Sequence, residues 1–467
     1  MARYSSTRGQ VKNLLFEEAV MMGLADDGGL LVPNEIPLIR NTLPEWRALS
    51  FTELSLEVML LFTSGRIPRD ELKKLIERSF DTFRHPEITP VKSVGQIHIL
   101  ELFHGPTFAF KDVALQFLGN LFEFFLKERN HPLRILGATS GDTGSAAIHG
   151  LHGKKGVDVF MLHPKGRVSP MQELQMTTVL DPNIHNLAIE GTFDDAQAIV
   201  KALFNDQEFK KNYYLGSVNS INWARILAQI VYYFYAWFQV ANDESELVSF
   251  VVPTGNFGNV LAGYYAKCMG LPIDKLVIGT NENDILHRFF SKGEYHRAEI
   301  IETFSPSMDI QISSNFERYL FNLAGNSAEQ LQLWMNNFER TGKLTIEGDL
   351  LNNAQNDFIS ARVDDEEIVE TIRKFHLQTG YLLDPHTAVG VCAAEKTDIQ
   401  TPVICLACAH PAKFGETVRK ALGNEPELPD ELALLDELET HCKTVPADAE
   451  TIKKVILETL EAKSFLP

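Results

Sequence analysis

The sequence contains few cysteines for its length. Its 467 residues include five, namely Cys268, Cys392, Cys405, Cys408 and Cys442, an odd and sparse set that argues against a disulfide framework. Cys405 and Cys408 form a C-x-x-C pair, but no second pair completes a zinc site. Because the pair lies in the apolar segment PVICLACAHP, we interpret both residues as core cysteines of a buried strand, and we predict no metal site.

Positive charge is also scarce. The chain has 43 lysines and arginines against 62 aspartates and glutamates, a formal net charge of −19. Nucleic-acid binders need a basic face, so DNA and RNA are excluded as main partners. An acidic protein can still hold a small anion, because one pocket of backbone N–H groups is enough for a phosphate.

Long apolar segments are absent as well. The N-terminal MARYSSTRGQ lacks an apolar run behind a basic start, so no secretory signal is predicted. The most apolar stretch, residues 226–241, is interrupted by Gln229 and Gln239 and is too short to span a bilayer. It is typical of a buried helix. We therefore expect a cytoplasmic protein without a membrane partner.

The chain does contain an alternation of strands and helices. Helical spacing of apolar residues predicts helices over 50–64 and 68–83, while the Gly- and Pro-rich segment 26–37 is expected to be a loop. From about residue 96, short β-branched runs alternate with helical segments. This pattern predicts an α/β fold with parallel sheets covered by helices, and the length predicts two or three domains.

The first candidate site residue is Lys111, in the segment HGPTFAFKD. It lies where a loop enters a helix predicted over 112–129, close to Phe108 and Phe110. The positive end of the helix dipole and the apolar neighbours both favour the neutral amine, the form that attacks an aldehyde. Taken alone, the lysine is better explained by a side chain that reaches solvent.

Two further loops join a strand to a helix. In ATSGDTGSAA, Ser140, Gly141, Asp142 and Thr143 offer hydroxyls and free N–H groups before a helix expected from Gly144, although Asp142 opposes a bare anion. In VVPTGNFGNVLAG, the loop residues precede a helix expected over 259–269. The second loop contains no lysine or arginine and matches neither the Walker A loop nor the G-x-G-x-x-G fingerprint.

Each loop alone could be an ordinary helix cap. Together they supply an amine, a cradle for a phosphate and a second anion site, which are the groups that a pyridoxal 5′-phosphate enzyme needs. A dehydrogenase on the same sheet is the competing interpretation, and the missing glycine fingerprint counts against it. A third is a protein of this fold without activity, which gives no reason for a lysine at position 111.

At these residues the chain resembles the threonine synthase family. The likeness begins with STRGQ and GLADDGGLLVP and continues through LFHGPTFAFKD, ATSGDTGSAA and SVNSINWARILAQ. It ends with PTGNFGNVLAG, DPHTAVG and AHPAKF, and the order of these motifs makes the resemblance specific.

The resemblance implies a fold type II pyridoxal-phosphate enzyme, similar to the tryptophan synthase β chain. Two parallel-sheet α/β lobes and a mainly helical N-terminal domain are expected. The predicted division is an N-terminal domain over 1–90, a large cofactor-binding domain over 91–130 and 226–467, and a small substrate-side lobe over 131–225. The predicted assembly is a monomer or a homodimer.

The resemblance also implies roles for single residues. Lys111 matches the lysine that holds the cofactor as a Schiff base. The cofactor-binding residues are Lys111, Cys408 and the phosphate loop of Gly255, Asn256, Phe257, Gly258 and Asn259. The substrate-binding residues are Ser140, Gly141, Asp142, Thr143, Asn219, Asn222 and Arg225. Cys408 departs from the family, where a threonine hydroxyl commonly meets the pyridine nitrogen, and a thiol is a weaker partner.

The implied reaction converts O-phospho-L-homoserine and water to L-threonine and phosphate. Lys165, Arg167 and Arg225 are candidate clamps for the departing phosphate, since such a step needs a cationic or hydrogen-bonding group. His104 and His410 flank the expected site, and we interpret both as structural. The nearest alternative is a related phospho-lyase that uses the same cofactor residues and releases 2-oxobutyrate.

Overall fold

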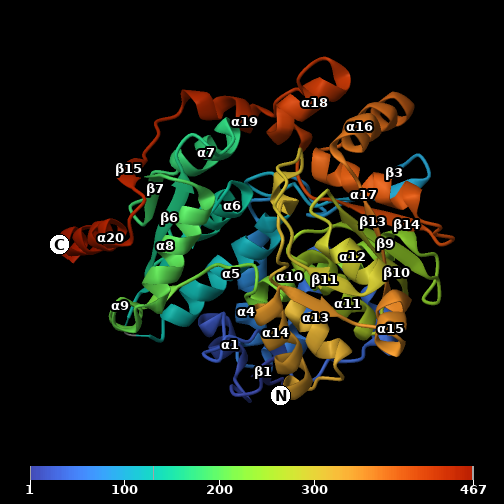
Figure 1. Ribbon diagram of the computed structural model, residues 1–467, viewed down its shortest axis with the longest axis horizontal. Coiled ribbons are helices and arrows are strands. Elements are labelled where there is room, and N and C mark those ends of the chain that lie inside the picture. Colours follow the sequence, from blue (N-terminus) through green and yellow to red (C-terminus); the bar gives the residue numbers. More distant parts are fainter. Residues whose placement is uncertain (1, 130, 465–467) are drawn as a thin grey trace. The chain divides into compact units, whose positions relative to one another are not determined.

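The protein is described by a computed structural model that covers residues 2–129 and 131–464 (Figure 1). The chain forms two compact units. Unit 1 consists of Met1–Ala114 and Ser220–Glu427, and unit 2 of Leu115–Asn219 and Leu428–Pro467. Each contains its own mainly parallel sheet, which confirms the predicted α/β class with two sheet-containing lobes.

The sheet of unit 1 has six strands in the order β13-β10-β9-β14-β4-β3. Only β3 runs antiparallel to its neighbour; the other pairings are parallel, so β4, β9 and β14 end at the same edge. Ligands of such sheets bind outside the carboxyl ends of the strands. The strands are β3 Val91–Val94, β4 Ile97–Glu101, β9 Val248–Pro253, β10 Ile273–Thr280, β13 Phe358–Arg362 and β14 Val403–Ala407.

Helices cover this sheet, and two of them reach the candidate site. Helix α17 packs against β9, β10 and β14, and α10 packs along α11. Outside the six-stranded sheet, residues 220–427 form the elements α10 Trp223–Val240, α11 Gly258–Cys268, α12 Ile285–Lys292, β11 Glu294–His296, η2 Pro306–Met308, α13 Phe316–Leu323, α14 Ala328–Thr341, β12 Lys343–Thr345, α15 Asp349–Asp357, α16 Asp365–Thr379, α17 Pro385–Lys396, η3 Pro411–Phe414 and α18 Gly415–Leu422.

Helix α10 is the apolar segment that the sequence predicted to be a buried helix. Its Gln229 is accommodated in the core because the amide donates to the Arg225 carbonyl oxygen at 2.7 Å, and its Oε1 lies 3.2 Å from the Tyr232 hydroxyl oxygen. Among the residues that the structure describes, no helix is both long and apolar enough to cross a membrane.

The N-terminal segment of unit 1 is mainly helical, as predicted. Helix α3 begins with a capping box in which the Ser50 hydroxyl accepts from the Glu53 N–H and the Glu53 carboxylate accepts from the Ser50 N–H. The prediction of a loop over 26–37 is wrong in part, because β2 pairs with β1 at the start of the chain. The elements are β1 Tyr4–Ser6, α1 Phe16–Met22, β2 Leu31–Pro33, η1 Arg40–Thr42, α2 Leu43–Trp46, α3 Phe51–Thr63 and α4 Arg69–Phe80.

The sheet of unit 2 has five parallel strands in the order β15-β7-β6-β5-β8. Helix α5, which begins in unit 1, continues into this part of the chain. The elements are α5 Lys111–Leu126, β5 Leu133–Ala138, α6 Asp142–Leu151, β6 Val157–Pro164, α7 Pro170–Thr177, β7 Ile184–Glu190, α8 Phe193–Asn205, α9 Gln207–Asn212, β8 Leu215–Gly216, α19 Asp430–Ala433, η4 Leu434–Glu437, β15 Lys443–Pro446 and α20 Ala449–Ser464.

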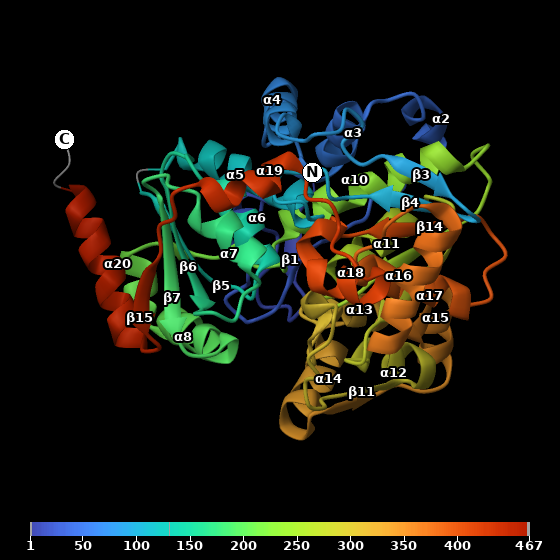
Figure 2. The ribbon, with the colours of Figure 1, turned by 90° about the horizontal axis from the view of Figure 1, so that it is seen from above.

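The C-terminal segment belongs to this second sheet. The sequence placed residues 428–467 with the larger lobe, whereas β15 extends the sheet at β7 and α20 packs on α8 (Figure 2). In α20, Ile452 and Ile456 are fully buried in the core of unit 2. The pairing of β15 and the packing of α20 together place this segment in unit 2. The domain limits as a whole stay a prediction.

Candidate active site

Lys111 is the first residue of α5, at the end of a loop that leaves β4. This loop is fastened to the loop after β14: Phe110 N–H donates to the Cys408 carbonyl at 2.8 Å, and His410 N–H donates to the Phe108 carbonyl at 3.1 Å. Phe108 has a positive φ of 58°, which is uncommon for a bulky residue and marks a tightly constrained turn. Two neighbouring strand ends thus fix the start of the helix.

The Lys111 side chain is buried, with 9% of its surface exposed. Its Nζ lies 3.5 Å from Ser307 Oγ and 5.5 Å from the centre of the Phe110 ring. An amine in such surroundings is shielded from bulk water, and the aromatic neighbour predicted at position 110 is in place. The geometry agrees with a reactive lysine better than with one that reaches solvent.

Next to Lys111, a buried aspartate holds the loop. The Asp112 carboxylate accepts from the Thr107 N–H and the Thr107 hydroxyl, each at 2.8 Å, and the Lys413 ammonium donates to the Thr107 carbonyl at 2.8 Å. Burial raises the pKa of Asp112 to about 6, although the hydrogen bonds from Thr107 oppose the shift. Asp112 and Lys413 are therefore structural supports for the lysine.

A second set of polar groups lies behind Ser307. The Ser307 N–H donates to His386 Nε2 at 3.2 Å, and His386 Nδ1 is 2.9 Å from the Asp384 carboxylate. Because Nε2 accepts this hydrogen bond, the ring proton is on Nδ1, and Nδ1 donates a hydrogen bond to the Asp384 carboxylate. Asp384 also caps α17 and accepts from the Thr387 hydroxyl, which in turn accepts from the Cys408 N–H at 3.3 Å.

These contacts connect Lys111, through Ser307 and His386, with the end of β14. The sequence did not identify Ser307, Asp384, His386 or Thr387 as site residues. A signal existed for three of them, because Asp-Pro-His-Thr is a helix N-cap followed by proline at the first turn. Ser307 gave no local signal, since it lies 196 positions from Lys111 in the three-residue 3-10 helix η2.

The loop predicted to hold a phosphate joins β9 to α11. The helix begins at Gly258, one residue earlier than predicted, and no side chain caps it. A Cβ atom at Gly255 would lie 3.1 Å from the Met308 Cα and the Ser307 carbonyl oxygen, and one at Gly258 would lie 3.1 Å from Asn315 Nδ2. Glycine is favoured at both positions because other chain segments pack closely against the loop.

Asn259 completes this loop and is itself buried. Its Oδ1 accepts from the hydroxyls of Tyr232 at 2.5 Å and Tyr233 at 3.1 Å. Its Nδ2 is buried without a hydrogen-bond partner in the described part of the chain. A buried donor without an acceptor is costly, so this amide fits a site that a ligand oxygen completes. An uncapped helix start with such a donor fits a phosphate ester.

Cys408 lies at the carboxyl end of β14, with 7% of its surface exposed. Its Sγ is 3.8 Å from the Leu406 carbonyl oxygen, a weak contact for a thiol. Cys405 is fully buried in the strand, and burial raises the pKa of its thiol. The prediction of core cysteines for the C-x-x-C pair is confirmed.

The loop containing Ser140, Gly141, Asp142 and Thr143 belongs to unit 2. Helix α6 begins at Asp142, two residues before the predicted start. The Asp142 carboxylate accepts from the Gln172 side-chain amide at 2.8 Å. Thr139 Oγ1 accepts from the N–H groups of Gly141 at 3.0 Å and Gly144 at 2.9 Å. Ser140 is exposed at the helix entrance and Thr143 is partly buried.

The remaining predicted substrate residues divide into two kinds. Asn222 is the N-cap of α10, and its amide also donates to the Val20 carbonyl at 2.8 Å, so its contacts are structural. Arg225 is buried in the first turn of α10, where burial lowers its pKa to about 10. Asn219 is exposed in unit 2, as are the candidate clamps Lys165 and Arg167.

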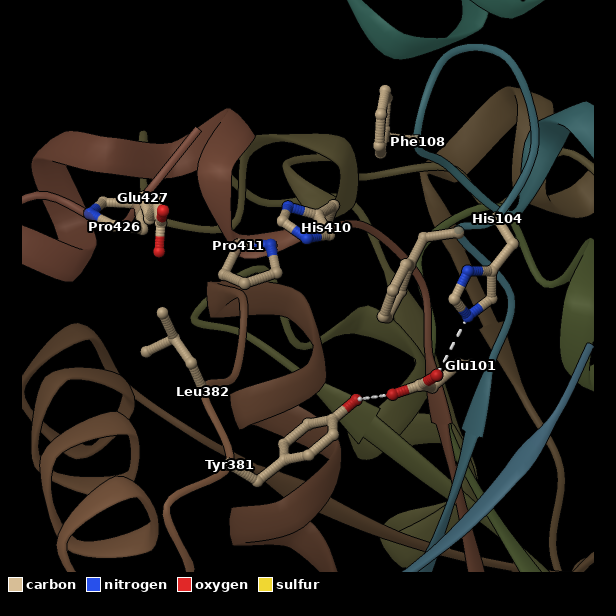
Figure 3. A pocket seen from close by; sticks show the side chains of 10 residues that line it. Glu101, His104, Phe108, Tyr381, Leu382, His410, Pro411, Pro426 and Glu427 are labelled. Carbon is tan, nitrogen blue, oxygen red and sulfur yellow. Dashed lines mark hydrogen bonds and ion pairs between the residues drawn. The ribbon is translucent and has the colours of Figure 1, made fainter. Parts of the chain in front are cut away.

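A cavity of about 450 Å³ lies at the carboxyl ends of β4 and β14, beside the loop of Lys111 (Figure 3). Inside it, Glu101 accepts from the Tyr381 hydroxyl at 2.8 Å and is 2.9 Å from His104 Nε2. His410 Nδ1 accepts from the Ala412 N–H at 3.2 Å, and burial lowers the pKa of His410 to about 4. Both histidines thus have structural contacts.

Comparisons with known proteins cover nearly the whole chain. Family models match for the threonine synthase N terminus over residues 3–80, for a pyridoxal-phosphate dependent enzyme over 84–332, and for the threonine synthase C-terminal part over 387–456.

Curated relatives agree. Threonine synthase from Schizosaccharomyces pombe is 51% identical, and threonine synthase from Saccharomyces cerevisiae is 49% identical; each match covers 98% of both chains. Among solved structures, PLP-bound threonine synthase from Brucella melitensis is 44% identical, with a TM-score of 0.96 over 98% of this chain and 99% of that one.

Proposed function

We propose, since the chain belongs to the threonine synthase family, that it converts O-phospho-L-homoserine and water to L-threonine and phosphate. It is a pyridoxal-phosphate dependent enzyme, and the proposed reaction makes it a carbon–oxygen lyase acting on phosphates in the last step of threonine biosynthesis. A small molecule is its substrate. A cytoplasmic location and a monomeric or homodimeric assembly stay predictions.

The observation that carries the proposal is the environment of Lys111. The amine starts a helix, is 9% exposed, and lies beside an aromatic ring and the Ser307 hydroxyl. An amine at the positive end of a helix and away from water is disposed to react as a nucleophile. We assign Lys111 as the residue that binds the cofactor aldehyde covalently.

The cofactor, once bound, withdraws electrons from the amino-acid substrate and so makes its Cα–H bond acidic. Lys111 is then the group that takes the Cα proton and returns protons in later steps. Ser307, 3.5 Å from Nζ, orients the amine for this work. The proposed reaction ends with loss of phosphate from Cγ and addition of water at Cβ.

Gly255, Asn256, Phe257, Gly258 and Asn259 are proposed to hold the cofactor phosphate. Support comes from the uncapped start of α11, the close packing at the two glycines and the buried, unpartnered Asn259 Nδ2. These features supply N–H donors without a competing side chain. Cys408, at the neighbouring strand end, is proposed to lie against the cofactor ring and to be a weak partner for its nitrogen.

The substrate side is proposed to involve Ser140, Gly141, Asp142 and Thr143, with Asn219 and Arg225. Asn222 is proposed to act by positioning, because its amide is used in capping α10 and in the contact with Val20. For the departing phosphate, Lys165 and Arg167 are available as exposed cations of unit 2, and Arg225 as a buried cation of unit 1.

The proposal is tested by replacing Lys111 with alanine. Turnover should fall at least about 10³-fold, because both covalent binding and proton transfer depend on this amine. In the wild-type enzyme, borohydride reduction should fix the cofactor to the peptide that contains Lys111, as mass spectrometry would show. Lys127→Ala, beyond the other end of α5, is the matched control and should keep full activity.

Product analysis separates the proposed reaction from its nearest alternative. Wild-type enzyme supplied with O-phospho-L-homoserine should release threonine and phosphate in equal amounts. Release of 2-oxobutyrate and ammonia instead would identify a phospho-lyase. A cofactor adduct on another lysine would contradict the assignment of Lys111 whatever the product.

A further inference from the structure

The proposed phosphate loop has no cation of its own, yet a buried arginine lies behind it. Arg318, on α13, is fully buried and belongs to unit 1 together with the loop. Its guanidinium donates to the Leu31 carbonyl at 3.0 and 2.9 Å, to the Ile221 carbonyl at 2.6 Å and to Asn315 Oδ1 at 2.7 Å. Every one of these acceptors is neutral.

The nearest carboxylate in the sequence is committed elsewhere. Glu317 accepts from the Thr7 hydroxyl at 2.7 Å and pairs with Arg8 at 3.2 Å. Arg318 therefore has its hydrogen bonds satisfied by carbonyl groups while its charge has no direct ion-pair partner among the described residues. Burying a charge in this way is expensive and suggests a role beyond packing.

Asn315 connects this arginine with the loop. Because its Oδ1 accepts from Arg318, its Nδ2 faces the other way and donates to the Asn256 carbonyl at 3.1 Å; its backbone N–H donates to the same carbonyl, also at 3.1 Å. Two residues earlier in the same segment, the Ser313 hydroxyl donates to the Gly255 carbonyl at 2.8 Å and holds the loop at a second point.

Fixing two carbonyl groups also fixes two N–H groups. In a trans peptide, the carbonyl of one residue and the N–H of the next point in opposite directions. With the carbonyls of Gly255 and Asn256 held by residues 313–315, the N–H groups of Asn256 and Phe257 are turned away from that segment and are free to face an anion. The segment thus sets the direction of the loop's donors.

We propose that Arg318 is a positioning residue for the cofactor phosphate: through Asn315 it orients the N–H groups of the loop, and it places a buried positive charge behind them. The inference rests on the proposed assignment of residues 255–259 to the phosphate. Burial lowers the pKa of Arg318 to about 10, so the guanidinium stays protonated near neutral pH. A bound phosphate then supplies a negative charge opposite the Arg318 guanidinium, whose hydrogen-bond acceptors in the described residues are neutral.

The test compares two aldehydes that differ only in the phosphate. Cofactor-free enzyme is titrated with pyridoxal 5′-phosphate and with pyridoxal, following absorbance and tryptophan fluorescence. Arg318→Gln and Asn315→Ala should each weaken pyridoxal 5′-phosphate binding by about 10- to 100-fold, the effect of losing a hydrogen bond to a charged group. Pyridoxal affinity should change by less than about twofold, and stabilisation of the apoenzyme by inorganic phosphate should be lost.

Arg47→Gln is the matched control. Arg47 also holds backbone carbonyls in unit 1, those of Phe238 and Ala241, but none of its contacts reaches the loop. It should leave the ratio of the two affinities unchanged. If Arg318→Gln does not fold, Asn315→Ala carries the same prediction. Equal weakening of both aldehydes in these variants, or an unchanged ratio, would overturn the proposal.

Gly258→Ala separates this inference from the assignment of the loop. A methyl group there would press on Asn315 Nδ2 from 3.1 Å and disturb the loop directly. The phosphate preference is the affinity for pyridoxal 5′-phosphate relative to pyridoxal. If Gly258→Ala loses this preference and Arg318→Gln keeps it, the role of Arg318 is refuted and the assignment of the loop stands. A normal preference in Gly258→Ala, Asn315→Ala and Arg318→Gln together would show that the phosphate binds elsewhere.

Discussion

Two loops of the molecule share one topology and differ in chemistry. The β9–α11 loop of unit 1 and the β5–α6 loop of unit 2 both follow a parallel strand and end at the start of a helix. In the first, carbonyl groups are held from behind and Asn259 Nδ2 has no partner among the described residues. In the second, Thr139 accepts from two N–H groups and Asp142 is held by Gln172.

The difference shows that a helix start is not by itself an anion site. In the described part of the chain, Asn259 Nδ2 has no acceptor, and the β9–α11 loop contains no acidic side chain, which suits a phosphate dianion. The β5–α6 loop uses part of its donor capacity internally and contains a carboxylate, so a second phosphate would be repelled there. It is better suited to a ligand that brings both signs of charge, as an amino acid does.

Among the changes that compare the two loops, the largest effect is expected from Gly141→Ala. Gly141 has φ 149°, and a Cβ atom there would lie 2.2 Å from Gln172 Oε1, so alanine strains the backbone and displaces the partner of Asp142. We expect a loss of about 3 kcal/mol or more in local stability and at least a 100-fold fall in kcat/KM. Pyridoxal 5′-phosphate affinity should stay within about twofold. A variant that loses cofactor but keeps its substrate KM would reverse the roles of the two loops.

A pH test compares the two buried aspartates in the first turns of α5 and α6, Asp112 and Asp142. Burial raises the pKa of Asp112 to about 6, above its ordinary value of 3.8. A carboxyl with a raised pKa binds more protons in the folded state, so its contribution to stability falls as pH rises from about 4 to about 6. Over that pH range, the unfolding free energy of the wild type should therefore fall relative to that of Asp112→Asn by at most about 3 kcal/mol.

Denaturant unfolding at pH 4, 5, 6 and 7 measures this shift. Subtracting the variant from the wild type removes the titration of other groups, since both proteins share them. Asp142→Asn serves as the control for replacing a buried helix-start aspartate. A difference between wild type and Asp112→Asn that is flat with pH would show that the Asp112 carboxyl is ionised throughout.

An isosteric exchange of charge tests the loops directly. Asn259→Asp keeps the oxygen that accepts from Tyr232 and Tyr233 but replaces the free amide by a second oxygen. Placing this negative charge at the proposed phosphate site should weaken pyridoxal 5′-phosphate binding by about 2 kcal/mol, or about 30-fold, with a smaller effect on pyridoxal. Asp142→Asn, the reverse exchange in unit 2, should leave cofactor affinity unchanged and alter the substrate KM.

The sequence was sufficient for the features that depend on local order. The start of α5 at Lys111, the strand before each loop and the glycines at 141, 255 and 258 follow from short-range patterns. Ser307 and Arg318 did not, because their importance arises from contacts between segments 79 to 287 positions apart. The position of residues 428–467 beside the second sheet did not follow either, since it depends on the pairing of β15 with β7 and on the packing of α20 on α8.

The smallest effect is expected at Cys408, which tests whether the end of β14 contributes to the cofactor site at all. Its thiol lies 3.8 Å from the Leu406 carbonyl oxygen, a weak contact for sulfur. In Cys408→Thr the hydroxyl is a stronger partner for a ring nitrogen, so cofactor affinity should rise by less than about 1 kcal/mol and the absorbance maximum of the bound cofactor should shift. Cys405→Ser, in the same strand, should lower stability without moving the spectrum. If both variants keep the wild-type spectrum, the cofactor ring does not meet this residue.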